Sequence, residues 1–206
     1  RDQPRSRGLG DVYKRQGQKK ALPPASAIKT TFAPRPKRES RKTPVKIIPL
    51  GGLNEIGKNM TVIECCNDIF IIDCGLAFPD TEMPGVDIVI PDFTYIERNR
   101  DKVRGVVLTH GHEDHIGGLA YLLKKVNVPV YGTKLTLGLV DGKLKEHGLS
   151  GKVKLIVTAP RKTVKMGCMA VEFIKVNHSI PDAVGMAIHT PAGVIVHTGD
   201  FKVDYS

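Results

Sequence analysis

Apolar and polar residues follow two periodicities along residues 45–206, and together these predict a mixed α/β domain. Leu119, Leu122, Leu123 and Val126 share one face of a predicted helix over residues 117–126, and a second predicted helix over 133–147 ends at Gly148. Short runs rich in β-branched residues predict strands, with a tight turn at Asn67-Asp68 between the second and third. The strands are expected at 45–50, 61–66, 68–73, 104–109, 129–131, 153–157, 169–176, 184–189 and 194–197. Strand-rich blocks with interspersed helices favour an α/β sandwich.

The segment before this domain has a different composition. Residues 1–44 are rich in Pro, Lys, Arg and Ser, and this composition predicts a disordered tail. Residues 1–46 hold 14 Lys/Arg against 3 Asp/Glu, so the net charge of +10 arises entirely from this end of the chain. The tail is interpreted either as an arm that attracts RNA phosphates or as a plain solvated segment. Residues 8–16 resemble translated sequencing-adapter sequence, so an artefactual origin is a further interpretation for residues 1–16.

Composition excludes several classes of protein. No apolar run approaches the roughly 18 residues that a membrane span needs. The polar, basic N-terminus lacks the apolar core of a secretory signal. The four cysteines, Cys65, Cys66, Cys74 and Cys168, lack the paired spacing of a zinc knuckle. We interpret them as reduced, buried small hydrophobic residues, which fits a cytoplasmic location.

The densest group of chemically active side chains follows the predicted strand 104–109 and reads His-Gly-His-Glu-Asp-His-Ile-Gly-Gly from His110. In extended backbone, residues two apart project to the same side, so His110 and His112 can hold one ion. Asp114 and His115 then face a second ion as the chain turns into the helix. Nitrogen and carboxylate ligands without thiolate suit zinc or manganese. A single histidine is usually an ordinary surface or core residue, but this spacing predicts a metal site.

The His-x-His-x-Asp-His spacing resembles the signature of the metallo-β-lactamase superfamily, whose α/β fold is an αββα sandwich with two divalent metals at one sheet edge. Three further residues match the landmarks of that family in chain order. Asp73 matches the acidic residue that braces the metal loop from outside the ligand shell. His178 matches the next ligand, and Asp200 matches the carboxylate that bridges the two metals.

Stretches outside the metal signature resemble the ribonuclease J family, a β-CASP group within that superfamily. The matching stretches are Pro-Leu-Gly-Gly-Leu-Asn-Glu-Ile-Gly-Lys-Asn-Met over 49–60, and residues 72–80, 84–92 and 178–183. Some family members hold a structural cation, such as calcium, in the turn over 84–87. The resemblance makes the Gly85 carbonyl and Asp87 candidate ligands, with a plain turn as the alternative.

The resemblance implies hydrolysis of RNA phosphodiesters by 5′–3′ exonuclease and endonuclease activity, in RNA processing and decay in the cytoplasm. It assigns His110, His112 and His178 to the first ion and Asp114 and His115 to the second, with Asp200 as the bridge. The reaction implied is attack by a metal-bound hydroxide held at Asp114 and Asp200, with zinc, manganese or magnesium as the metal. The family's partners are RNA, copies of the same chain in dimers or tetramers, and other RNA-decay proteins.

The family's further histidine ligand, its β-CASP insertion and its C-terminal parts have no counterpart in residues 1–206. We therefore expect the chain to be an N-terminal part of such a protein, weakly active or inactive by itself. Two other classes stay open, a thioester or lactone hydrolase on the same fold and a non-catalytic RNA-binding scaffold. The intact ligand set weighs against the scaffold.

The remaining histidines and several lysines receive weaker assignments. We expect His147 at a helix C-terminus and His189 and His197 in the core or behind the metal ligands. Four lysines are candidates for phosphate contacts, with plain solvation as the alternative; they are Lys58, Lys124, Lys125 and Lys202.

Overall fold

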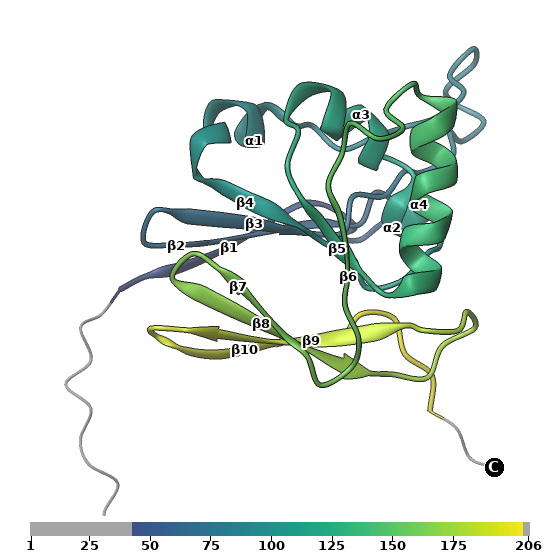
Figure 1. Ribbon diagram of the computed structural model, residues 1–206. Helices are drawn as coiled ribbons and strands as arrows, with labels where there is room; N and C mark the ends of the chain where they lie inside the picture. Colours follow the sequence, from purple (N-terminus) through teal and green to yellow (C-terminus); the bar gives the residue numbers. More distant parts are fainter. Residues whose placement is uncertain (1–42, 204–206) are drawn as a thin grey trace, which may run out of the picture. The chain divides into compact units, whose positions relative to one another are not determined.

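The computed structural model describes residues 43–203. The predicted tail over 1–44 therefore lies outside the described residues, apart from residues 43 and 44 that lead into the first strand. The described part contains two sheets stacked face to face, with helices over the outer face of the first sheet (Figure 1). Among residues 43–203, no helix has the length and apolar character needed to cross a membrane.

The first sheet has six strands in the order β1-β2-β3-β4-β5-β6. The β1–β2 and β2–β3 pairs are antiparallel, whereas β3, β4, β5 and β6 run parallel to one another. Its strands are β1 (Val45–Gly51), β2 (Met60–Cys65), β3 (Asp68–Ile72), β4 (Val103–Val107), β5 (Val130–Gly132) and β6 (Leu155–Val157).

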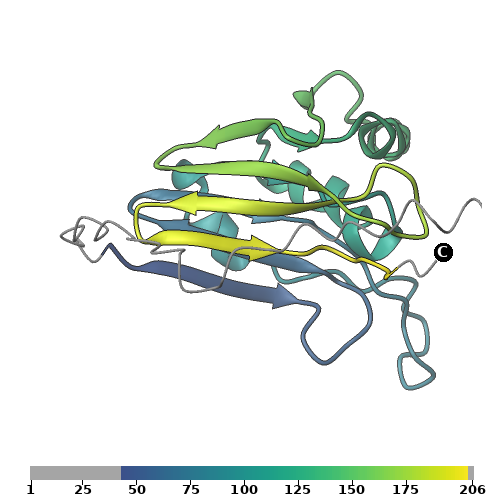
Figure 2. The ribbon, with the colours of Figure 1, turned by 90° about the horizontal axis from the view of Figure 1, so that it is seen from below.

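The second sheet has four antiparallel strands in the order β10-β9-β8-β7. They are β7 (Thr163–Met166), β8 (Met169–Lys175), β9 (Val184–Thr190) and β10 (Gly193–His197). Figure 2 shows that the strands of the two sheets run in nearly the same direction, as in aligned sandwich packing.

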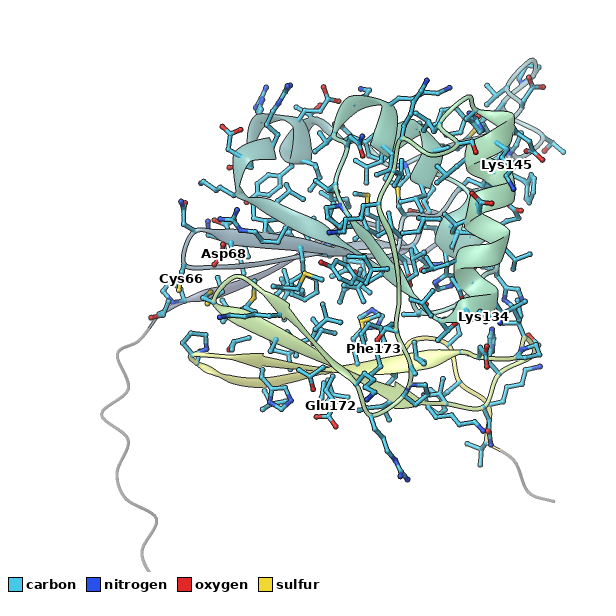
Figure 3. The ribbon with its side chains drawn as sticks, in the orientation of Figure 1. Cys66, Asp68, Lys134, Lys145, Glu172 and Phe173 are labelled. Carbon is cyan, nitrogen blue, oxygen red and sulfur yellow. The ribbon has the colours of Figure 1, made fainter. Side chains whose placement is uncertain are left out.

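Side-chain alternation along the strands creates two separate cores. On β3, Ile69 and Ile71 pack toward the helices, whereas Phe70 and Ile72 pack toward the second sheet. Phe173 of β8 lies in this second core, and its neighbour Glu172 projects away from the sandwich (Figure 3). Strands buried on both faces read as continuous apolar runs, which explains why β3 has no polar alternation.

Helices that connect parallel strands cover the first core. They are α1 (Thr94–Arg98), the short 3-10 helix η4 (Arg100–Lys102), α2 (Glu113–Ile116), α3 (Leu119–Lys125) and α4 (Lys134–Glu146). Each of α3 and α4 buries an apolar face that includes Leu122 and Val140 respectively. The described residues thus form three layers, helix, sheet and sheet, in agreement with the partial αββα sandwich expected from the sequence.

Several local predictions need correction. The β2–β3 turn is formed by Cys66 and Asn67 instead of Asn67 and Asp68, and Cys66 takes the left-handed φ of 56°. The helix predicted over 117–126 is α3, which begins at Leu119 after the Gly117-Gly118 pair, and the short helix α2 before that pair was not predicted. The strand predicted from 153 begins at Leu155. The elements α1, η4 and β7 were not predicted, since each is five residues or shorter and carries little periodic signal.

Candidate metal centre

Strand directions bring the predicted ligands to one edge of the sandwich. Asp73 and His110 follow the carboxyl ends of β3 and β4, which are parallel neighbours and therefore end at the same edge. His178 and Asp200 follow β8 and β10, which both run antiparallel to β9 and so also end together. A backbone hydrogen bond of 3.0 Å from the Val184 amide to the Thr109 carbonyl joins the two groups of loops.

The first cluster contains three imidazoles. His112 Nδ1 lies 3.0 Å from His110 Nε2 and 3.2 Å from His178 Nε2. Ligands around a tetrahedral zinc lie about 3.3 Å apart at the usual zinc–nitrogen distance. The three nitrogens therefore converge with the spacing of ligands to one ion, and among the described residues they form one of the groups able to hold a metal.

The second cluster contains one imidazole and two carboxylates. His115 Nε2 lies 3.5 Å from Asp114 Oδ2 and 3.5 Å from Asp200 Oδ2. Asp200 Oδ2 is also 3.8 Å from His178 Nε2 of the first cluster. Because Asp200 is within reach of ligands from both clusters, its position fits the predicted bridge between two ions.

Buried hydrogen bonds fix the orientation of the ligands. Asp73 accepts hydrogen bonds from the Thr109 amide (2.7 Å), the Thr109 hydroxyl (2.7 Å) and His115 Nδ1 (2.8 Å). The Thr109 hydroxyl has one proton and gives it to Asp73, so it accepts from His110 Nδ1 at 3.0 Å. Protonation of Nδ1 on both histidines directs their Nε2 atoms toward the two clusters. Asp73 adopts φ of 59°, an unusual conformation that these three hydrogen bonds hold in place.

The pKa values of the two most buried imidazoles move in opposite directions. Burial, assisted by the nearby charge of His115, lowers the pKa of His110 to about 4. Burial also acts to lower the pKa of His115, but the hydrogen bond and charge of Asp73, with smaller contributions from Asp114 and Asp200, raise it to about 9. His110 is therefore a neutral ligand at pH 7, whereas His115 must release a proton before it binds a cation.

A divalent cation fits this donor set. The donors are neutral imidazole nitrogens and carboxylate oxygens, which suit zinc, manganese and similar ions. His178 Nδ1 is buried without a hydrogen-bond partner among the described residues. Glu113 lies inside the motif but outside both clusters, since it pairs with Lys143 of α4 at 2.6 Å.

The Gly117-Gly118 pair allows a close approach between two backbone segments. The loop after β3 lies directly against α2, with hydrogen bonds from the Cys74 amide to the His115 carbonyl (2.8 Å) and from the Gly118 amide to the Cys74 carbonyl (2.9 Å). A Cβ atom at Gly118 would lie 2.5 Å from the Gly75 carbonyl oxygen, and one at Gly75 would lie 1.6 Å from the Asp114 carbonyl oxygen. These glycines thus permit Asp114 and His115 to sit over the end of β3.

Sequence reasoning missed two polar residues of the centre. Asn59, in the loop before β2, places its amide nitrogen 3.3 Å from Asp114 Oδ2 and 3.2 Å from His115 Nε2. Thr109 directly precedes the motif, so its position offered a signal, but its role depends on Asp73 at a distance of 36 residues along the chain. Nothing local to Asn59 indicates its contact, because the loop meets α2 only through the fold.

Other predicted residues have mixed outcomes. His147 is the C-cap of α4, as predicted, and it contacts Tyr121 and Lys124. The prediction for His189 is wrong, because this residue is exposed and lies beside Glu172. His197 is half-buried and accepts a hydrogen bond from the Gly199 amide at 3.2 Å, directly before Asp200.

The cysteine prediction is correct for two of the four residues. Cys65 and Cys74 are buried, but Cys66 and Cys168 are exposed because both occupy turns.

The turn over 84–87 is exposed, and Gly85 adopts φ of 81°. A left-handed glycine accounts for the turn without a cation, so the ligand role of Gly85 and Asp87 stays a prediction. Lys58 pairs with Glu55 and Lys125 pairs with Glu97, whereas Lys202 has an exposed position two residues beyond Asp200.

Comparison with known proteins agrees with this geometry. Residues 53–204 match the family model of the metallo-beta-lactamase superfamily. The chain is 51% identical over 164 residues to Ribonuclease J of Synechocystis sp., covering 79% of this chain and 26% of that protein. It is 52% identical over 167 residues to Ribonuclease J of Thermus thermophilus, covering 78% of this chain and 29% of that protein. The chain thus spans less than a third of the length of these relatives.

Solved structures support the fold. A protein of unknown function from Enterococcus faecalis aligns with a TM-score of 0.57 at 21% identity, over 77% of this chain and 44% of that one. The metallo-beta-lactamase fold protein YhfI from Bacillus subtilis aligns with a TM-score of 0.51 at 22% identity, over 76% of this chain and 63% of that one. This fold implies binding of divalent metal, and the described residues include histidine and aspartate groups that could hold one. The chain belongs to the metallo-β-lactamase superfamily, and within it the similarity is to the ribonuclease J proteins.

Proposed function

We propose that the protein is a metal-dependent ribonuclease that hydrolyses RNA phosphodiester bonds at the centre formed by the two clusters. The observation that carries the proposal is the position of Asp200, within 3.5 Å of His115 Nε2 and 3.8 Å of His178 Nε2. A carboxylate shared by two ligand clusters is the arrangement expected of a two-metal hydrolase. The similarity to ribonuclease J proteins supports RNA as the substrate.

His110, His112 and His178 would hold the first ion, and Asp114 and His115 the second, with Asp200 between them. Two such ions would supply a hydroxide at neutral pH and neutralise charge on the phosphate oxygens. Zinc or manganese suits these ligands, and magnesium is a further candidate.

The residues around the ligands would keep the centre in one geometry. Thr109 and Asp73 hold the imidazoles of His110 and His115 with Nε2 toward the other candidate ligands. Asn59 donates a hydrogen bond to Asp114 Oδ2 and so restricts rotation of that carboxylate. Preorganised ligands and charges of this kind lower the barrier because they need no rearrangement during the reaction. The exposed Lys202 carries a positive charge beside this edge, where an RNA phosphate would approach.

We infer 5′–3′ exonuclease and endonuclease activity in RNA processing and decay in the cytoplasm, by a dimeric or tetrameric enzyme that works with other RNA-decay proteins. These properties rest on the similarity to ribonuclease J proteins, of which this chain spans less than a third.

The test uses the full-length protein that contains this chain, with 5′-monophosphorylated and 5′-triphosphorylated RNA of the same sequence. Metal-dependent release of mononucleotides, faster from the monophosphorylated RNA, is the expected result. The double substitution His110→Ala, His112→Ala should remove the activity because it removes two ligands of the first cluster.

His189→Ala is the matched control. This histidine is exposed on β9 and contacts Glu172, so its loss should leave RNA cleavage unchanged. Absence of RNA cleavage by the metal-loaded protein would refute the proposal, and thioesters and lactones would then be the substrates to examine.

A further inference from the structure

Three cysteines gather at the end of the sandwich opposite the metal centre. Cys65 ends β2, Cys66 lies in the β2–β3 turn, and Cys168 lies in the turn between β7 and β8. The β2–β3 turn lies beside the start of β4, because Ile69 pairs with Val103. His110 follows the other end of β4, so the cysteines and the histidine clusters occupy opposite edges of the first sheet. Figure 3 shows Cys66 and Asp68 at this edge.

The three sulfur atoms lie close enough to share one ion. All three lie within 4.8 Å of one another, and the Sγ atoms of Cys65 and Cys66 are 3.8 Å apart. Three thiolates around one metal at the roughly 2.3 Å of a zinc–sulfur bond would lie about 4 Å apart in a planar arrangement. A disulfide requires a sulfur–sulfur distance of about 2.05 Å, so these are separate thiols.

The two turns are joined by specific contacts. The Cys168 amide donates to Asp68 Oδ2 at 2.7 Å, and the Cys168 thiol donates to the Cys65 carbonyl at 3.2 Å. A Cβ atom at position 167 would lie 2.0 Å from the Asp68 carboxyl carbon, so Gly167 is required for this approach. Arg104 of β4 holds the other oxygen of Asp68 at 2.5 Å. The position of Cys168 beside the β2–β3 turn is therefore built into both sheets.

We propose that Cys65, Cys66 and Cys168 form a second metal site, which takes a soft monovalent cation, Cu(I), as three thiolates. Thiolate ligands select soft ions such as Cu(I) and zinc over the harder ions that suit nitrogen and oxygen donors. Zinc in a structural site needs a fourth ligand. Among the described residues, the group able to hold a metal here contains the three cysteines alone, and both oxygens of the neighbouring Asp68 are engaged.

Loading the site exchanges protons for the ion. Burial and hydrogen bonding to the neighbouring cysteines raise the pKa of Cys168 to about 12, and burial raises the pKa of Cys65. The thiols of Cys65 and Cys168 are therefore neutral at pH 7 before the ion binds. Binding of one Cu(I) forms three sulfur–copper bonds and releases three protons to solvent, with no change in oxidation state.

An ion can reach the cluster from solvent. Cys66 and Cys168 are exposed; Cys168 lines one surface depression, and Cys65 and Cys66 line another. The site would therefore load without unfolding of the sandwich, although Cys65 itself is buried.

The test is a titration of the full-length, metal-free, reduced protein with Cu(I) under anaerobic conditions, against a chromophoric Cu(I) chelator. We expect one equivalent of Cu(I) that gives thiolate-to-copper charge-transfer absorption. Cys168→Ser should lose this absorption and weaken binding by more than about 100-fold, beyond the roughly 10–100-fold cost of losing a partner outside the ligand shell. Cys66→Ser should behave in the same way.

Asn67→Ala is the matched control, because Asn67 is exposed in the same turn and has no thiol, and it should bind Cu(I) as the unsubstituted protein does. The thermal midpoint of each variant verifies its fold, and both substituted cysteines are exposed. Equal Cu(I) binding in the protein and in Cys168→Ser would overturn the proposal, as would copper bound without thiolate absorption or tight binding of Zn(II) alone. Imidazole-bound copper at the histidine clusters would give no thiolate absorption, so the two sites are distinguished.

Discussion

Replacing Thr109 by valine should weaken the first metal cluster without removing any ligand. The hydroxyl of this fully buried residue donates to Asp73 at 2.7 Å and accepts from His110 Nδ1 at 3.0 Å. Valine has nearly the same shape but offers neither bond, so His110 loses the contact that selects its tautomer. Loss of a partner outside the ligand shell lowers metal affinity about 10–100-fold, or about 1.4–2.7 kcal/mol.

The same substitution should destabilise the metal-free domain. A hydrogen bond to a charged group contributes about 1.5–3 kcal/mol, and a buried donor left unpaired costs about 1–3 kcal/mol. Both effects belong to one network and do not add fully, so we expect a loss of about 2–4 kcal/mol in the free energy of unfolding. Amide hydrogen exchange in β4 measures this loss within the full-length protein.

Metal affinity is measured by competition with a chromophoric chelator. Thr109→Ser keeps the hydroxyl and should bind metal nearly as the original protein does. Thr136→Val removes a buried hydroxyl on α4 that pairs with Thr133 at 3.0 Å, so it should reduce stability without reducing metal affinity. If Thr109→Val and Thr109→Ser bind metal equally, the hydroxyl does not orient His110 and the reasoning fails.

Two further predictions concern pH and packing. The pKa of His115 is about 9, above its ordinary value of about 6.5, so this histidine must lose a proton before it binds metal. Metal affinity at the second cluster, measured by chelator titration, should therefore rise about tenfold per pH unit from 7 to 9. Asp73→Asn should flatten this dependence. In the metal-free protein the same shift stabilises the fold fully below pH ~6.5, and this contribution is lost as the pH rises through about 9. Gly118→Ala should lower the thermal midpoint through an overpacking cost of about 1–3 kcal/mol, since its Cβ would meet backbone. Gly138→Ala, in open space on α4, should add about 0.5–1 kcal/mol to the free energy of unfolding and so raise the midpoint. A lower midpoint for Gly138→Ala than for Gly118→Ala would contradict the packing argument.

The sequence predicted the longer elements because their signal is local. Helix α4 and the strands β2, β3, β8 and β9 each carry enough apolar residues in one period to be recognised. The strand β7 has only Val164 and Met166 as inward-facing apolar residues, and its Lys165 alternates with them on the exposed face. A four-residue pattern is too short to predict a strand by itself, and β7 is recognised as a strand only by its pairing with β8.

The burial of the cysteines could likewise be predicted only in part from the sequence. Residue type alone favours burial of cysteine, and Cys65 and Cys74 follow that preference. Cys66 and Cys168 lie in turns of different sheets, and the contact that joins these turns is between Asp68 and Cys168, which are 100 residues apart in the chain. No spacing in the sequence indicates a cluster of this kind.

By itself, the sequence predicted the candidate ligands of the metal centre. His110, His112, Asp114 and His115 lie within six residues, so local backbone geometry alone requires them to be neighbours. His178 and Asp200 could be matched to a family order, but no local property distinguishes them from ordinary residues at strand ends.

Only the tertiary structure decided how these residues act together. The parallel pairing of β3 with β4 places Asp73 beneath Thr109 and His115, and the common direction of β8 and β10 places Asp200 between the clusters. Burial then separates the pKa values of two imidazoles that are identical in the sequence. The physical reason is that hydrogen bonding, desolvation and charge depend on distances in space, and these are set by strand pairing between segments far apart in the chain.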